Sequence, residues 1–200
     1  MGVAAYDRSL DLRAVDDAMA IGQARDDVVR LRFHQPYRIP VGRLPIDYID
    51  VVTPFRRVEL AAEERARVGD RMFRQREALT VLAEHGDTLQ LFVEAAFHPQ
   101  NVYVRVPAYA VTLARPDQPA RIRPRDEQRL PRFGPRVDSV LPLPYPVAPS
   151  LPAGGQPLTG GTVIATFDGQ RLDPGATYEV VIEEAERELA RARLDLGKLR

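Results

Sequence analysis

The sequence predicts an α+β protein, mainly β, in which a small helical region precedes an antiparallel β-sandwich. Apolar residues recur at helical spacing near the start of the chain, whereas alternating apolar residues separated by turns, without crossover helices, dominate after Gly86. We therefore expect residues 1–86 to form a helical region with one strand, packed on the sandwich. Residues 87–200 are expected to form the sandwich itself.

The first part contains the predicted helices. Between about residues 9 and 32 the apolar spacing and a favourable capping serine predict one or two helices. Residues 46–60 are rich in β-branched and aromatic residues, which predicts a strand. A further helix is expected to begin near Asp70 and to end at Gly86, because glycine is common just past a helix C-terminus.

The second part contains segments with strand periodicity. A half-buried strand shows apolar side chains at every second position, because successive side chains point to opposite faces. In the stretch 102–113 the parity of the alternation changes, which predicts a bulge or kink near Pro107. The expected strands cover residues 89–95, 102–113, 162–167, 177–182 and 188–196.

A proline- and arginine-rich insertion is expected over residues 116–160. It holds 11 of the 18 prolines, and proline lacks the N–H that a central strand needs. The sequence therefore predicts a long connection rather than a set of central strands. The glycine pairs at 154–155 and 160–161 predict a flexible loop, because the lysine and strand-to-helix context of a phosphate-binding loop are missing.

A short motif follows this insertion. Leu172, the Pro174-Gly175 turn and Tyr178 come directly before an alternating strand that reaches Ile182. The motif resembles that of fibronectin type III domains, and the resemblance implies an immunoglobulin-like sandwich. It further implies that Tyr178 forms a tyrosine corner, in which the hydroxyl bonds to upstream backbone, with Leu172 and Pro174 as structural residues.

Composition excludes several function classes. Basic and acidic residues balance at 28 each, so no global field attracts the protein to nucleic acid or to an anionic membrane. The absence of cysteine excludes thiolate catalysis and iron–sulfur clusters. Lys198 is the single lysine, which we interpret as the codon bias of a GC-rich bacterial genome.

Localisation rests on analogy. The uncharged run 139–167 is rich in proline, which argues against a membrane-spanning helix, and the first residues do not form a signal peptide. We expect a bacterial envelope or periplasmic location, where sandwich modules are common, with the cytoplasm as the alternative.

No catalytic signature is present. His34, His85 and His98 lack metal-ligand spacing, so we predict no metal site and no cofactor unless the fold brings a histidine together with Glu94 or an aspartate. The serines lie outside known nucleophile motifs. We therefore expect a protein that is not an enzyme, and a hydrolase with a convergent site at His34 or His98 is the third hypothesis.

The leading hypothesis is a non-catalytic protein-interaction or scaffold protein of a bacterial envelope assembly. A cluster of arginines and a polyproline-like segment over residues 141–152 supply its expected contact surface. The predicted partner-binding residues are Arg121, Arg123, Arg125, Arg129, Phe133, Tyr145, Pro146, Pro149 and Pro152. A solvated arginine-rich loop is the alternative interpretation, and nucleic acid is not expected because Phe133 alone could stack on a base.

The second hypothesis is a carbohydrate- or small-ligand-binding module. Tyrosine rings offer flat apolar surfaces with a polar tip, which suits stacking on a ligand. The candidate stacking residues are Tyr37, Tyr48, Tyr103, Tyr109 and Tyr145.

Overall fold

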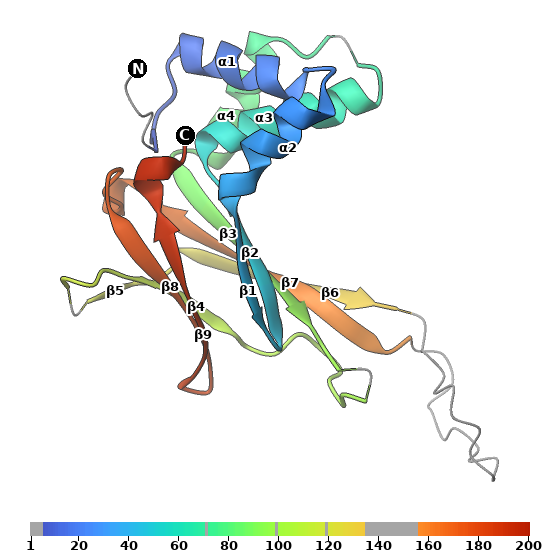
Figure 1. Cartoon of the computed structure of the whole chain (residues 1–200), viewed down its shortest axis with the longest axis vertical. Helices are drawn as coiled ribbons and strands as arrows, with labels where there is room; N and C mark the ends of the chain where they lie inside the picture. Colours follow the sequence, from blue (N-terminus) through green and yellow to red (C-terminus); the bar gives the residue numbers. More distant parts are fainter. Residues whose placement is uncertain (1–5, 71, 99, 119, 135–155) are drawn as a thin grey trace.

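The computed structural model describes residues 6–70, 72–98, 100–118, 120–134 and 156–200. A helical layer comes first in the chain and gathers at one end of two antiparallel sheets (Figure 1). The described helices are α1 (Leu12–Gly22), α2 (Asp27–His34), α3 (Pro54–Arg67) and α4 (Gln75–His85). Within the described ranges, no helix is both long and apolar enough to cross a membrane. The predicted α+β class is confirmed.

The first sheet has five strands, in the order β1-β2-β3-β7-β6. Their bounds are β1 (Arg38–Arg43), β2 (Ile46–Val52), β3 (Thr88–Ala96), β7 (Leu158–Asp168) and β6 (Asp126–Phe133). The second sheet has the order β5-β4-β8-β9. Its strands are β5 (Arg121–Ile122), β4 (Ala110–Ala114), β8 (Thr177–Glu184) and β9 (Arg187–Asp195).

The immunoglobulin-like connectivity is not confirmed. Three successive strands, β1, β2 and β3, are neighbours in the first sheet, whereas the immunoglobulin sheets ABED and CFG contain no such run. The predicted division at residue 86 falls between α4 and β3. Two strands from the first part, β1 and β2, are hydrogen-bonded into the same sheet as β3, where one strand was predicted.

The main core lies between the inner faces of the two sheets. Leu89, Leu91, Val93 and Ala95 on β3 are all fully buried in it, which confirms the predicted alternation. A sheet that buries one face against another shows this period of two. The same core includes Val111, Leu113, Val163, Ala165, Phe167, Val180, Ile182, Ala190 and Leu194.

The helices have a smaller core of their own, formed by apolar side chains of α1, α3 and α4. Gly22 on α1 allows α3 to approach closely, because an added Cβ would lie 2.3 Å from the backbone oxygen of Glu59. Phe33 on α2 is partly buried against both cores. It therefore links the helical layer to the sandwich.

The strand predicted over residues 46–60 is too long. It ends at Val52, and α3 begins at Pro54. The Thr53 side chain caps this helix by accepting a hydrogen bond from the backbone N–H of Arg56 (3.1 Å). Pro54 sits in the first turn, where the N–H that proline lacks would have no helical partner. The β-branched residues at the start of the segment favoured a strand, so Thr53 and Pro54 were not recognised as the start of a helix.

The helix predicted from Asp70 begins later than expected. The Asp70 carboxylate accepts a hydrogen bond from the backbone N–H of Met72 (2.8 Å), and α4 starts at Gln75. The predicted end at Gly86 is confirmed by its φ of +62°, a conformation that favours glycine.

Two predictions in the second part are wrong. Val102 and Val104 do not form a strand, and their side chains are 91% and 87% exposed. The glycine pair at 160–161 does not lie in a loop but within β7, between β3 and β6. Glycine at these positions allows close approach of backbone and side chains from neighbouring strands.

The predicted long connection also contains strands. Residues 121–133 form β5 and β6, each at the edge of its sheet. An edge strand tolerates Pro131, since one side of its backbone needs no ladder partner. Residues 135–155 of the predicted insertion lie outside the described residues.

Candidate functional site

The edge strand β6 is the most exposed strand of the first sheet. It pairs with β7 on one side over Asp126–Phe133, and seven of its eight residues are exposed. Its apolar side chains Leu130 and Phe133 are each 51% exposed. An edge of this kind presents unpaired backbone donors and acceptors to an incoming strand.

Five arginines lie on or just before β6. Arg121 is on β5, Arg123 and Arg125 lie in the connection to β6, and Arg129 and Arg132 are on β6. The two carboxylates of this segment are Asp126 and Glu127, so residues 121–133 carry an excess of three positive charges.

Three of these arginines form ion pairs. Arg121 contacts Glu183 (2.6 Å), Arg129 contacts Glu127 (2.9 Å) and Arg132 contacts Glu94 (2.9 Å). Arg123 and Arg125 are exposed and have no ion pair with the described part of the chain. The positive charge available to a ligand is therefore concentrated at the start of β6.

A hollow of about 750 Å³ adjoins this segment, between β4, β5 and the start of β6. Arg121, Arg123 and Arg125 line it together with Thr112. The Thr112 hydroxyl is buried and has no hydrogen-bond partner among the described residues. A buried hydroxyl without a partner is unfavourable.

The remaining predicted residues divide into two groups. Tyr145, Pro146, Pro149 and Pro152 lie outside the described residues. Tyr178 is buried at the start of β8, and its hydroxyl accepts a hydrogen bond from the backbone N–H of Asp173 (2.7 Å), five residues upstream. Leu172 is buried in the main core, and Pro174 lies in the turn that follows it.

The tyrosines proposed to stack on a ligand differ in how far they are exposed to solvent. Tyr37 and Tyr109 are buried and cannot present a ring face to solvent. Tyr48 is half-buried under the Arg38 guanidinium, which lies 4.3 Å from its ring centre. Tyr103 is 41% exposed and packs beside Phe97, with ring centres 5.0 Å apart.

His34 has two carboxylate neighbours that sequence reasoning missed. Its Nε2 lies 3.4 Å from Glu59 Oε1 and 3.2 Å from Glu63 Oε2, both on α3. Burial and the nearby Glu63 carboxylate raise the pKa of Glu59 to about 7. The signal in the sequence was the spacing of four between the two glutamates, which places both side chains on one face of a helix. The signal was missed because residues 46–60 were predicted to form a strand.

The other histidines remain apart from this cluster. His98 lies in a turn, where its Nδ1 accepts a hydrogen bond from the backbone N–H of Gln100 (3.2 Å). His85 Nδ1 lies 3.0 Å from the backbone oxygen of Val81, within α4.

The fold thus defines an α+β protein with an N-terminal helical region followed by two antiparallel sheets. Comparison of the chain with protein-family models, curated proteins and solved structures finds no match.

Proposed function

We propose that this protein is a non-catalytic protein-interaction or scaffold protein of a bacterial envelope assembly. Its β6 edge receives an extended, acidic segment of a partner, which adds to the first sheet as a further strand. The observation that carries this proposal is the edge position of β6, with eight residues paired on one side to β7.

Strand addition draws its affinity from backbone hydrogen bonds and its specificity from side chains at alternate positions. Leu130 and Phe133 offer apolar contacts to such a segment. Natural sheets usually protect a long edge, because an exposed one pairs with other chains. An edge with half-exposed apolar residues therefore suits a binding surface.

Charge determines the chemistry of the partner. Arg123 and Arg125 are exposed in the connection just before β6, without an ion pair in the described ranges. A cationic end of the strand favours a segment with carboxylates at its matching end, because complementary charge accelerates association and fixes register. Binding is expected to weaken as ionic strength rises.

A pull-down with the full chain as bait tests the proposal, run separately on the soluble and envelope fractions of the native organism. The variant Arg123→Glu/Arg125→Glu should lose the partner, whereas Arg76→Glu, which alters a fully exposed arginine on α4, should retain it. Hydrogen exchange of the purified complex should show new amide protection over residues 126–133. Equal retention by both variants, or protection elsewhere, would reject the β6 edge as the site.

A carbohydrate- or small-ligand-binding module is the second proposal. It is supported by the partly exposed ring of Tyr103 beside Phe97. A glycan array compares the parent protein with Tyr103→Ala. Signals that disappear in the variant would favour this module over strand addition, and an array without signals would count against it.

A further inference from the structure

Two glutamates and one histidine converge between α2 and α3. Glu59 and Glu63 are four residues apart on α3, so one helical face carries both carboxylates. His34, the last residue of α2, directs Nε2 between them. One ligand atom from each of the three side chains lies within 4.8 Å of the other two.

Glu59 lacks the hydrogen bonds that a buried carboxylate needs. Its side chain is fully buried, and neither oxygen has a hydrogen-bond partner in the described part of the chain. The contact with His34 at 3.4 Å is within ion-pair distance but does not have hydrogen-bond geometry. A buried carboxylate is unfavourable unless it is protonated, paired or bound to a metal ion, and the two Glu59 oxygens have room in their bonding for such a partner.

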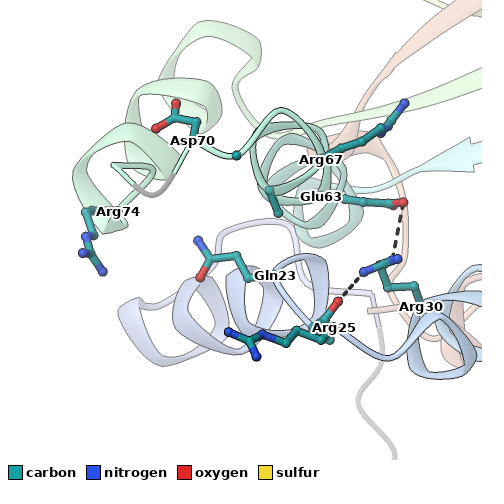
Figure 2. Close-up of a pocket in the computed structure, with 10 residues that line it drawn as sticks. Gln23, Arg25, Arg30, Glu63, Arg67, Asp70 and Arg74 are labelled. Atoms are coloured by element: carbon teal, nitrogen blue, oxygen red, sulfur yellow. Dashed lines mark hydrogen bonds and ion pairs between the residues drawn. The ribbon is translucent and has the colours of Figure 1, made fainter.

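The surrounding helices fix this arrangement. Gly22 brings α1 against the backbone of Glu59 and Glu63, where an added Cβ would clash with both residues. The Arg30 guanidinium lies 3.6 Å from Glu63 Oε1, which leaves Oε2 toward His34. Figure 2 shows Arg30 and Glu63 pointing toward each other at the edge of the hollow beside α3.

We infer that His34, Glu59 and Glu63 bind a divalent first-row transition-metal ion. Metal bonds of about 2.0 to 2.2 Å place neighbouring ligand atoms about 2.8 to 3.6 Å apart in octahedral or tetrahedral sites. The distances from His34 Nε2 to the two carboxylate oxygens, 3.2 and 3.4 Å, match this spacing. A bound cation would neutralise the buried Glu59 carboxylate.

The donor set selects the class of ion. One imidazole nitrogen with two carboxylates suits zinc-like ions, whereas magnesium and calcium prefer sets made of oxygen alone. Three protein ligands leave at least one position for solvent. The side chains of His34 and Glu63 are 23% and 25% exposed, which gives an ion access to the cluster.

The imidazole of the proposed site lacks a supporting hydrogen bond. His34 Nδ1 is buried without a hydrogen-bond partner among the described residues. Such partners orient a metal-binding imidazole, and their removal typically weakens binding by about 10- to 100-fold. The ring is positioned instead by edge-to-face packing on Phe33, with ring centres 5.4 Å apart. We therefore expect a site of moderate affinity.

Zinc binding by the full chain, stripped of metal, tests the inference. Equilibrium dialysis should show one Zn²⁺ ion bound per chain. This binding should depend on His34, Glu59 and Glu63. At a hundredfold excess of free Zn²⁺ over Kd, the melting temperature should rise by about 5 to 10 °C. The same concentration of Mg²⁺ should leave it unchanged.

Three single variants remove one ligand each: His34→Gln, Glu59→Gln and Glu63→Gln. Each should weaken Zn²⁺ binding at least 10-fold. Matched controls, His98→Gln for an exposed imidazole and Glu64→Gln for an exposed carboxylate on α3, should bind as the parent does. Binding that all three cluster variants retain, or a parent without stoichiometric binding, would overturn the inference.

The melting temperatures of the metal-free proteins show whether a variant loses Zn²⁺ binding because it has lost a ligand or because it is misfolded. Glu59→Gln replaces a buried carboxyl group that has no hydrogen-bond partner in the described residues with a neutral side chain of the same size, so the metal-free variant should melt at or above the temperature of the metal-free parent. Should that variant unfold, His34→Gln and Glu63→Gln decide the result, because both side chains are partly exposed.

Discussion

The Arg132 guanidinium on β6 reaches across β7 to the Glu94 carboxylate on β3, with Nη1 and Oε2 2.9 Å apart. A second nitrogen of the same guanidinium donates to the backbone oxygen of Ala95 (3.0 Å). The side chain passes over Gly160, where an added Cβ would lie 2.4 Å from it. Gly160 on β7 therefore leaves room for the Arg132 side chain, which links the β6 edge to β3.

The variant Gly160→Ala should destabilise the protein by about 1 to 3 kcal/mol, because its Cβ would also lie 2.3 Å from the backbone oxygen of Ala95. Urea denaturation measures the effect. Arg132→Ala removes the half-exposed ion pair with Glu94 and the hydrogen bond to the backbone oxygen of Ala95, and it should lower the free energy of unfolding by about 1 kcal/mol. Equal losses in the two variants would show that the backbone accommodates the methyl group.

Two buried tyrosines should respond in opposite ways to loss of their hydroxyl. Tyr178→Phe leaves the backbone N–H of Asp173 without its acceptor and should lower the free energy of unfolding by about 1 kcal/mol. The Tyr109 hydroxyl is buried without a partner in the described residues, so Tyr109→Phe should leave stability unchanged or raise it slightly. Denaturant midpoints compare both variants with the parent, and a stabilised Tyr178→Phe would contradict the argument.

Alkaline pH should destabilise the protein through Tyr6. Burial raises the pKa of Tyr6 to about 12 from its ordinary value of 10.0. Between these values the unfolded chain loses the proton while the folded chain keeps it, so stability falls as pH rises from 10 to 12. A difference of two pKa units corresponds to about 3 kcal/mol.

The matching measurement is urea denaturation at several pH values between 9 and 12 for the parent and Tyr6→Phe. The variant should lose about 2 kcal/mol less over this range, and the absorbance change of tyrosinate in the folded protein should be smaller by about half a residue near pH 12. An identical pH dependence in both proteins would show that the Tyr6 hydroxyl is accessible to solvent.

Close packing of α1 on α3 depends on Gly22. Gly22→Ala places a methyl group 2.3 Å from the backbone oxygen of Glu59 and should destabilise the protein by about 1 to 3 kcal/mol. Gly175→Ala is a suitable control, because its Cβ would come no closer than 3.9 Å to other atoms, and it should change stability by less than about 0.5 kcal/mol. Thermal or urea unfolding of both variants decides the comparison.

Local periodicity was sufficient for the core strands β3, β7, β8 and β9. The alternation from Leu89 to Ala95 predicted the buried face of β3, because a sheet covered on one face requires apolar residues at every second position. Gly86 marked the end of α4, since its positive φ favours glycine. These features depend on a residue and its chain neighbours.

Segments in which local preference conflicts with tertiary context were predicted incorrectly. Val102 and Val104 have high strand propensity but lie exposed in a loop. β6 forms in a proline-containing segment because pairing with β7 supplies a ladder that its own residues do not indicate. Strand propensity reflects packing on a sheet, so it is decided by neighbours that are distant in the chain.

The sequence by itself determined the α+β class, the alternating core strands and the residues that populate the arginine-rich segment. The tertiary structure decided that this segment forms a sheet edge and that His34 meets Glu59 and Glu63 from a different helix. Periodicity records which face of an element is buried, whereas the pairing of strands and the convergence of side chains depend on how elements pack, which sequence spacing does not encode.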